Sequence, residues 1–339
     1  MLQDPVSWCC DFRGPPASIG LDVGQSGVFP PFDELREVWS RALSLFVLVR
    51  EKRSVAFSWS AYGESQGAME KRRAAHEETG QAWDVVARVK YRLEFDAHVD
   101  HLRRGGTNLF EPGIELLHPL LPGAHVVQLQ CSHGLDALGL LNAGAASVLG
   151  VDISREMVAQ AESKARVLGL ESSASFIRAD AVAPPAEIFD TADVVYTGRG
   201  SLPWILDLGA WADSVVRILK PDGHIVLFEG HPLASLWDRT VPHLRMRPGA
   251  SYFSAEPAEE EGFPSAVVRR EAGEDRPRML ERHWRVGEVM DTLIAAGLEI
   301  RSLREYPDLF WDQFPDWPEA LRDKLPNSYS IVARRPAGA

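Results

Sequence analysis

Residues 125–152 read HVVQLQCSHGLDALGLLNAGAASVLGVD, and this stretch decides the fold class. The apolar run over residues 125–130 predicts a buried strand, residues 135–142 predict a helix, and residues 147–152 predict a second strand. A strand, a helix and a second strand in this order form a β-α-β unit, in which the two strands run parallel. The stretch therefore predicts an α/β protein built on a parallel sheet.

The same alternation of strands and helices continues along the chain. Further strands are expected over residues 175–178, 192–196 and 224–228, and further helices over residues 155–168 and 208–219, the second of which ends at a Pro-Asp-Gly turn over 221–223. A helix over residues 285–296 and strands over residues 298–303 and 328–333 follow after an interruption. Together these elements predict a Rossmann-like, doubly wound sheet.

The first part of the chain carries no clear structural signal. Residues 1–68 contain scattered Pro, Gly and Ser and lack a sustained hydrophobic period, so we expect a poorly ordered or accessory extension. Residues 32–49 have apolar side chains at helical spacing, which leaves a lid or a dimerisation arm as the alternative. Met69 is an alternative start of the protein.

The remaining residues divide into a cap and a main domain. Residues 69–123 carry apolar side chains at helical spacing beside many charges, and they predict a helical cap. Residues 124–335 predict the main domain. Residues 231–283 interrupt it with several prolines and an acidic cluster, and they have too few apolar residues for a core of their own. We interpret them as an insertion next to the substrate.

Composition limits the partners of this 339-residue chain. Lys and Arg total 36 against 48 Asp and Glu, and the net charge of −12 argues against a nucleic-acid partner, which requires a basic face. The three cysteines cannot form a disulfide framework or a Cys-x-x-Cys zinc pair, so a reducing, cytoplasmic location is expected. No apolar run reaches the length of about 18 residues needed to cross a membrane.

Ligands of open parallel sheets bind outside the carboxyl ends of the strands. Gly134, after the first strand, allows a tight turn and close approach of the backbone to a ligand. Asp152, after the second strand, can accept both hydroxyls of a ribose, and Asp180, after the third, can accept from the amine of a purine. A plain helix cap or a turn-forming Asp is the alternative interpretation of these acids.

The absence of a glycine-rich phosphate-binding motif limits which nucleotide ligands the site can bind. No G-x-G-x-x-G follows the first strand, so a pyrophosphate would lack its usual cradle. A nucleoside without phosphates requires only one close glycine and the acid that binds the ribose. This combination indicates S-adenosylmethionine.

Two residues after the fifth strand are candidate catalytic bases. Glu229 and His231 lie on the expected substrate side, and a base there can remove a proton from an oxygen or nitrogen nucleophile. Alternatively, Glu229 binds backbone N–H groups and His231 shapes a turn. Candidate contacts to the substrate are Tyr196, Arg199, Trp204 and Trp237. No histidine spacing typical of a metal site is present, and no metal is expected.

Several short motifs resemble the class I S-adenosylmethionine-dependent methyltransferases. The segments Val126–Gly134, Val151–Ser154 and Leu219–Gly223 are similar to the first motif, the ribose-binding turn and the turn before the fifth strand of that family. The resemblance covers roughly residues 80–335, and it is closest to a bacterial branch of small-molecule methyltransferases. It departs from the family at Gln128, where an acid is usual, and at two glycine positions held by Gln130 and Ser132.

The resemblance implies a role for each matching residue. It places Gly134, with Gln130 and His133, near the methionine part of the cofactor, Asp152 and Ile153 at the ribose, Asp180 and Ala181 at the adenine, and Thr197 and Gly198 along the wall beside the methyl donor. It also implies seven strands, of which the last is antiparallel.

The sequence therefore predicts methyl transfer from S-adenosylmethionine to a small molecule by in-line displacement at the sulfonium methyl. Aromatic side chains in the insertion and in residues 306–317 favour a partly apolar acceptor, such as a secondary metabolite. A protein that binds the cofactor without catalysis is one alternative, because the first motif is altered. A nicotinamide-dependent oxidoreductase is the other, although the missing glycine pattern argues against it. The oligomeric state stays open.

Overall fold

A computed structural model describes residues 66–338, apart from residues 261, 274–275, 309 and 312. The predictions made for residues 1–65 lie outside this range. None of the helices within it is long and apolar enough to cross a membrane.

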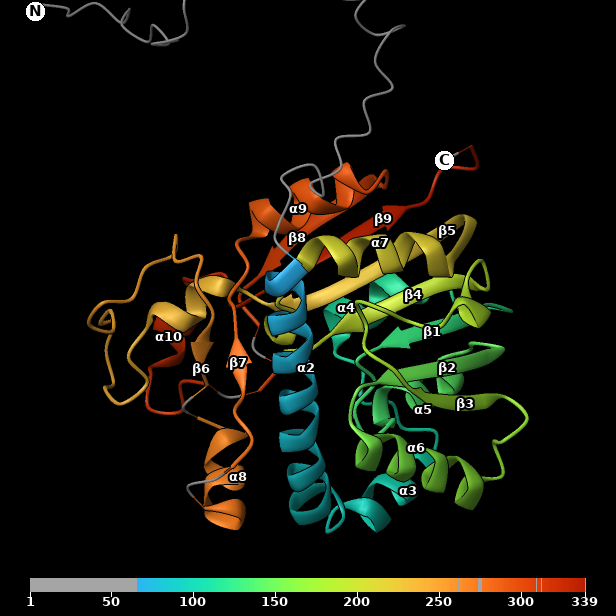
Figure 1. The fold of residues 1–339 in the computed structure, drawn as a ribbon, viewed down its shortest axis with the longest axis horizontal. Coiled ribbons are helices and arrows are strands. Elements are labelled where there is room, and N and C mark those ends of the chain that lie inside the picture. Colours follow the sequence, from blue (N-terminus) through green and yellow to red (C-terminus); the bar gives the residue numbers. More distant parts are fainter. Residues whose placement is uncertain (1–65, 261, 274–275, 309, 312, 339) are drawn as a thin grey trace, which may run out of the picture. The chain divides into compact units, whose positions relative to one another are not determined.

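A seven-stranded sheet forms the centre of the described region (Figure 1). Its strands are β1 (His125–Leu129), β2 (Ser147–Asp152), β3 (Ala174–Arg178), β4 (Ala192–Gly198), β5 (Leu219–Gly230), β8 (Glu299–Tyr306) and β9 (Ser328–Arg334). They are arranged in the order β3-β2-β1-β4-β5-β9-β8, and β9 runs antiparallel to both of its neighbours, whereas β1 to β5 are parallel. The predicted fold class and the antiparallel last strand are confirmed.

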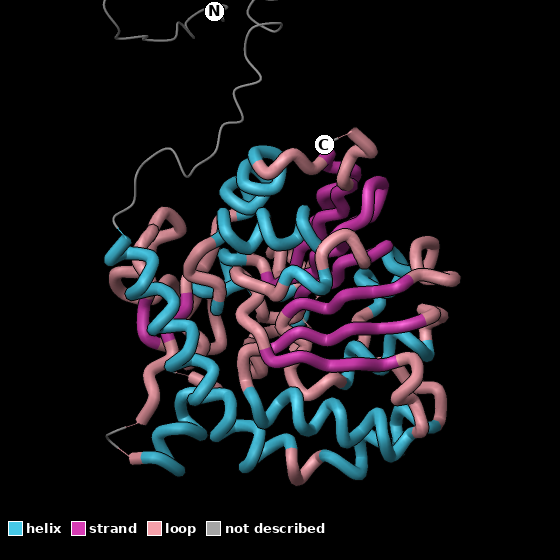
Figure 2. Tube along the Cα trace, turned by 45° about the vertical axis from the view of Figure 1, so that its right-hand side comes forward, coloured by secondary structure: helices cyan, strands magenta, loops and turns pink. Residues whose placement is uncertain are grey.

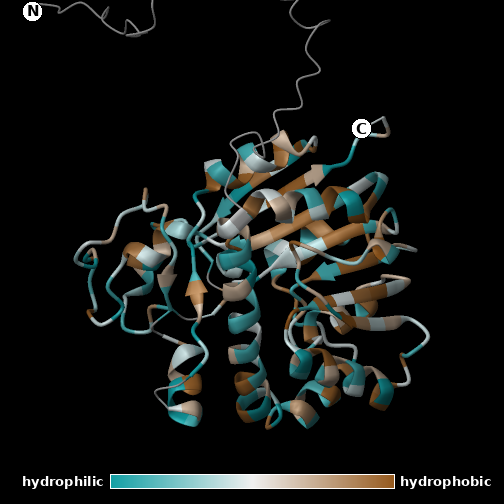
Figure 3. Ribbon diagram, in the orientation of Figure 1, coloured by the Kyte–Doolittle hydropathy of each residue, from teal (hydrophilic) through white to brown (hydrophobic). Residues whose placement is uncertain are grey.

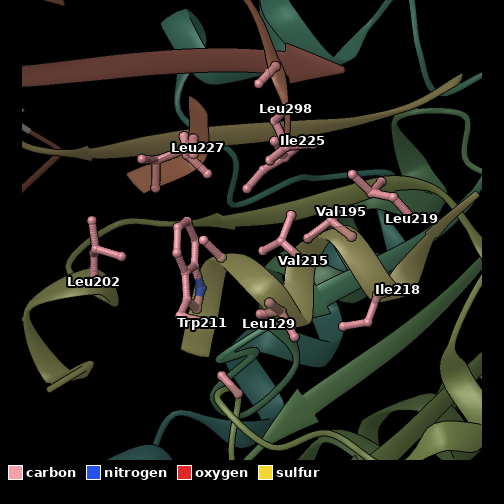
Figure 4. Close-up of a cluster of buried hydrophobic side chains, with 14 of the residues drawn as sticks. Leu129, Val195, Leu202, Trp211, Val215, Ile218, Leu219, Ile225, Leu227 and Leu298 are labelled. Carbon is pink, nitrogen blue, oxygen red and sulfur yellow. The ribbon is translucent and has the colours of Figure 1, made fainter. Parts of the chain in front are cut away.

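Helices cover both faces of the sheet (Figure 2). The helices α4 (Glu111–Leu117), α5 (Leu135–Asn142) and α6 (Arg155–Leu168) pack on one face, and α7 (Leu208–Ile218) and α9 (Val286–Ala295) pack on the other. Figure 4 shows Trp211 and Val215 of α7 among Val195, Ile225 and Leu227 of the sheet. Figure 3 shows the same division, with hydrophobic strands inside and mixed helices outside. These two apolar layers fix the positions of the strand ends.

The ends of α6 show why the predicted boundaries are correct. The side chain of Ser154 accepts a hydrogen bond from the backbone of Met157 at 3.2 Å, which is a standard N-cap. Gly169 ends the helix with a left-handed φ of 69°. The Pro-Asp-Gly segment is different from the prediction, since β5 already begins at Leu219 and includes Asp222 with a φ of 67°.

Helical segments before the sheet cover its carboxyl edge. They are α2 (Gln66–Val86), the π-helix η2 (Ala87–Tyr91) and α3 (Phe95–Arg103). In Figure 1, α2 lies across the ends of the parallel strands, with α6 on one side of it and α8 (Ser265–Ala272) on the other. A helical segment is therefore placed where a cap is expected, directly above the predicted ligand site.

The segment over residues 231–283 forms short elements that pack on other parts of the protein. They are η5 (Pro232–Leu236), β6 (Ala258–Glu259), α8 and β7 (Leu280–Glu281). Val268 and Met279 are buried in a cluster with Ala82 and Val86 of α2. The apolar side chains of this segment thus stabilise the covering helix.

Candidate active site

A cavity of about 700 Å³ opens at the carboxyl ends of the parallel strands. Its walls come from the strand ends, from α2, η2 and α3, from the segment around Pro264, and from the loop between β8 and β9. Of the predicted site residues, Gln130, His133, Asp152, Ile153, Asp180, Ala181, Gly198, Arg199 and Trp204 line this cavity. These residues, predicted from the ends of separate strands, therefore share one cavity.

Two residues of the turn after β1 adopt backbone angles that are usual for glycine. Gln130 and Ser132 adopt left-handed φ angles of 54° and 51°, which cost about 1–3 kcal/mol each for residues other than glycine. The Gln130 side chain donates from Nε2 to the carbonyl of Ser201 at 2.6 Å, and this bond helps to hold the turn. Both residues that depart from the family pattern therefore adopt backbone angles that glycine favours.

Gly134 has a packing role that the sequence did not reveal. Its φ is 78°, and a Cβ at this position would lie 2.5 Å from the Cβ of Ala161 in α6. Only a glycine permits this contact between the start of α5 and α6. Gly134 is not among the residues that line the cavity, and its contact with the cofactor stays a prediction.

Asp152 is oriented by two backbone amides. Its Oδ2 accepts from the N–H of Ser132 at 2.8 Å, and its Oδ1 accepts from the N–H of Ser154 at 2.9 Å. Burial raises the pKa of Asp152 to about 6, and these two amides act against that shift. Each carboxylate oxygen keeps a free lone pair, so a ribose diol can bind there.

Asp180 is held by a histidine of the covering helix. The Nε2 atom of His76 accepts from the N–H of Leu206 at 3.0 Å, so the ring proton lies on Nδ1. This Nδ1 is 2.9 Å from Oδ2 of Asp180, to which it donates. The N–H of Val182 donates to the other oxygen at 3.1 Å. The sequence analysis missed His76, because nothing local indicates that α2 reaches the end of β3.

Glu229 binds the loop after β4 and does not face the cavity. Its Oε2 accepts from the N–H groups of Ser201 and Leu202, each at 2.9 Å, and its Oε1 accepts from those of Gly200 and Gly230. Burial raises the pKa of Glu229, although all four amides favour the ionised form. These contacts are those of the alternative interpretation, in which Glu229 binds backbone N–H groups; here they hold the loop that lines the cavity.

His231 is also outside the cavity. Its Nδ1 accepts from the N–H of Leu233 at 3.2 Å and caps η5, and its Nε2 lies 3.0 Å from Oε1 of Glu305. Both ring nitrogens are thus engaged with the protein. These contacts favour the alternative, in which His231 shapes a turn.

The remaining predicted contacts divide between the cavity and the core. Tyr196 is fully buried, and Trp237 packs near Phe314, so neither lines the cavity. Thr197 lies behind the wall with its hydroxyl 3.0 Å from that of Ser201. Gly198 is on the wall, and a Cβ there would come within 2.1 Å of the carbonyl oxygen of Phe228.

Arg199 and a buried acid form part of the wall. Arg199 donates from Nη1 to Oδ1 of Asp136 at 3.0 Å and to the carbonyl of Asn108. The side chain of Asn108 donates to the same oxygen of Asp136 at 2.6 Å. Burial raises the pKa of Asp136, and Arg199 lowers it. The sequence analysis did not foresee this pair, because the two residues are 63 positions apart.

Aromatic side chains from separate segments complete the wall. They are Trp83 of α2, Trp204 of η4 (Leu202–Trp204), Phe263, and Trp311 of the β8–β9 loop. Trp83 makes edge contacts with Trp204 at 5.6 Å and with Phe263 at 6.4 Å between ring centroids. Trp311 is 51% exposed and lies against Gly200. Within the described range, no cluster of three or more His, Cys, Asp or Glu side chains has the arrangement of a metal site.

Comparison with known proteins places this site in a family. Residues 126–223 match the model of a family described as a methyltransferase domain. An S-adenosylmethionine-dependent methyltransferase from Mesorhizobium loti is structurally similar, with 22% identity, a TM-score of 0.49, and 66% of this chain and 96% of that chain covered. A Listeria monocytogenes protein considered to be of the same kind has 21% identity, a TM-score of 0.50, and coverage of 66% and 94%. No curated protein matches the sequence.

The family match over residues 126–223 and the order of the seven-stranded sheet agree with the predicted class I methyltransferase domain. The methyl donor of this class is S-adenosylmethionine. The chain thus combines this domain with a covering helix and with aromatic segments next to the cavity.

Proposed function

We propose that the cavity binds S-adenosylmethionine and a small, partly apolar acceptor side by side, and that the methyl group moves directly between them. The observation that carries this proposal is one cavity whose wall combines carboxylates with aromatic rings. Asp152 and Asp180 supply the carboxylates, and Trp83, Trp204 and Trp311 supply the aromatic surface.

Four residues of the wall fit the nucleoside part of the cofactor. Asp152 and Ile153 would hold the ribose, and Asp180 and Ala181 would contact the adenine. When bound, the cofactor supplies a methyl group activated by its positive sulfur. The protein holds the donor and the acceptor in line and excludes water, and such positioning supplies a large part of the acceleration in bimolecular reactions.

The aromatic part of the wall favours a planar or apolar acceptor. Aromatic rings bury large areas of a ligand, and pockets for small molecules are lined mainly by such side chains. Arg239 also lines the cavity, and it makes no hydrogen bond or ion pair within the described residues. The net charge of −12 remains unfavourable for nucleic-acid acceptors.

Titration calorimetry with S-adenosylhomocysteine, followed by transfer of a labelled methyl group to a panel of small acceptors, tests this proposal. We expect a Kd in the micromolar range, about −8 kcal/mol, and transfer to apolar or aromatic acceptors. Folded protein that binds NAD and no S-adenosylhomocysteine would contradict the proposal. Binding without transfer to any acceptor would support a non-catalytic cofactor-binding protein.

The position of His231 predicts that it is dispensable for the reaction. His231→Asn keeps an acceptor for the N–H of Leu233, so the turn should persist. We expect a single-turnover rate within about threefold of the wild type, whereas loss of a general base costs about 100-fold or more. A loss of that size with normal thermal stability would restore His231 as the base.

The exposed ring of Trp311 predicts a selective effect on the acceptor. Trp311→Ala removes a half-exposed ring from the wall, so stability should change little. We expect the KM of an apolar acceptor to rise about tenfold, which corresponds to about 1.4 kcal/mol, with unchanged affinity for S-adenosylhomocysteine. Phe253→Ala, which removes a 73% exposed ring outside the cavity wall, is the control. Equal effects of both variants would contradict this role.

A further inference from the structure

Lys164 is a buried cation without a carboxylate partner. It lies on α6 with a fully buried side chain, and no acidic side chain of the described residues comes within ion-pair distance of its Nζ. The ammonium donates to the carbonyl of His133 at 3.0 Å and lies 3.4 Å from Nδ1 of the same residue. Its only other partner among the described side chains is the ring of Phe95, at 5.1 Å from the centroid.

This arrangement is costly and therefore requires an explanation. Burial disfavours a charged ammonium and lowers the pKa of Lys164 to about 8, so the group is still mostly charged at neutral pH. At a buried position without a functional role, an apolar side chain of similar size usually gives equal or higher stability. Lys164 thus indicates a function that methionine or leucine could not supply.

The contact with Lys164 determines where His133 carries its proton. A charged ammonium has donors and no acceptor, so Nδ1 of His133 must be unprotonated and the ring proton lies on Nε2. Burial, followed by the charge of Lys164, lowers the pKa of His133 well below its usual value, so the ring stays neutral. His133 is consequently a neutral donor with a fixed tautomer.

The neighbours of His133 also hold the plane of its ring. His98 stacks on it at 4.8 Å with an interplanar angle of 4°, and Tyr91 lies at 4.1 Å. His133 lines the cavity, and its Nε2 makes no hydrogen bond within the described part of the protein. Glu94, which lies 3.8 Å from Nζ of Lys90, also favours the charged form of Lys164 but makes no ion pair with it. The positive charge of Lys164 therefore stays beside this donor.

We propose that Lys164 is a positioning residue that fixes His133 as an Nε2–H donor to a carboxylate of the bound ligand. The inference rests on the proposed function, because it needs a ligand in the cavity. A neutral N–H donor backed by a buried cation favours an anionic oxygen acceptor. The carboxylate belongs to the amino acid part of the cofactor or to an acidic acceptor molecule.

The tautomer can be measured directly on the intact protein. Long-range proton–nitrogen NMR spectra of protein with labelled histidine, with His133 assigned from its substitution, distinguish protonated from unprotonated ring nitrogens. We expect wild-type His133 to show only the Nε2–H form, and Lys164→Met to show a mixture with the Nδ1–H form. Lys164→Gln, which also removes the ammonium group, is the second variant and should show the same mixture. A wild-type His133 protonated on Nδ1 would overturn the proposal.

Ligand pairs identify the source of the carboxylate. S-Adenosylhomocysteine and 5′-methylthioadenosine differ in the amino acid part, and indole-3-acetate and indole-3-acetamide differ in a carboxylate on an acceptor-like molecule. We expect Lys164→Met to weaken the binding of one of the two acids about tenfold, which corresponds to 1.4 kcal/mol. The binding of the matching compound without the carboxylate should stay unchanged. His133→Gln should itself weaken the binding of the same acid, and adding Lys164→Met to it should cause no further loss.

Two outcomes separate this inference from the proposed function. If wild-type protein binds none of the adenosine compounds, the proposed function fails whatever Lys164 does. If the wild type binds S-adenosylhomocysteine, and Lys164→Met changes neither the tautomer nor any of the four affinities, only the role of Lys164 is overturned.

Discussion

Replacing Asp152 with asparagine is expected to weaken the binding of S-adenosylhomocysteine by about 100-fold or more. The carboxylate accepts from the N–H groups of Ser132 and Ser154 and keeps lone pairs toward the cavity. An asparagine loses one of these backbone bonds and offers a ribose only one acceptor. Hydrogen bonds to a charged group contribute about 1.5–3 kcal/mol each, so the loss of one or two of them gives this effect. Titration calorimetry measures it.

The control is an aspartate at the opposite end of a strand. Asp193, at the start of β4, pairs with Lys220 at 2.8 Å and accepts from the N–H of His125. Asp193→Asn alters a similar set of contacts far from the cavity, so affinity should stay within about threefold of the wild type. Comparable affinity of Asp152→Asn and the wild type would remove Asp152 from the binding site.

The same residue predicts how binding depends on pH. The pKa of Asp152 is raised to about 6 in the free protein. The ionised form accepts ribose hydroxyls, so affinity should be constant above this pKa and fall as pH decreases through about 6. Stability should change in the opposite direction, because the folded protein holds this proton more tightly than the unfolded chain, whose Asp has a pKa of about 3.9. Stability from this group is therefore lost as pH rises toward 6.

Local sequence patterns predicted the sheet because its strands are apolar and its helices begin and end at residues that are typical of helix ends. The boundaries of α5, α6 and β2 agree with those expected, since Gly134, Ser154 and Gly169 mark them in the sequence itself. The carboxyl-edge rule then placed Asp152 and Asp180 on the cavity wall. Both results follow from the order of strands and helices along the chain, which a single sequence contains.

The parts of the site that were missed depend on contacts between distant segments. His76 meets Asp180 across 104 residues, and Arg199 meets Asp136 across 63. Local spacing contains no information about such pairs, because they depend on how α2 and the loop after β4 pack. For the same reason, the sequence did not reveal that Glu229 lies within β5 and binds the loop after β4, or that His231 caps η5.

Replacing Glu229 with glutamine is expected to destabilise the protein and to abolish most of its activity without removing a base. Four backbone N–H groups converge on the buried carboxylate. Glutamine offers one acceptor oxygen, and its NH₂ group faces the remaining N–H donors, so about two buried amides lose their partners. At about 1–3 kcal/mol each, the free energy of unfolding should fall by roughly 3 kcal/mol, and Tm by about 5–10 °C. Calorimetric melting measures this change.

The activity of Glu229→Gln distinguishes positioning from proton transfer. The loop that Glu229 holds includes Gly200 and Ser201 of the cavity wall, so its displacement should weaken cofactor binding and slow methyl transfer equally at every pH. A missing base would instead leave affinity and Tm intact, and its effect would diminish as rising pH ionises the acceptor. Glu305→Gln, which changes an exposed partner of His231, is the matched control and should alter stability by less than about 1 kcal/mol. The loop after β4 thus depends on a buried acid of the neighbouring strand, which explains why an ionisable side chain at this position does not need to touch the substrate.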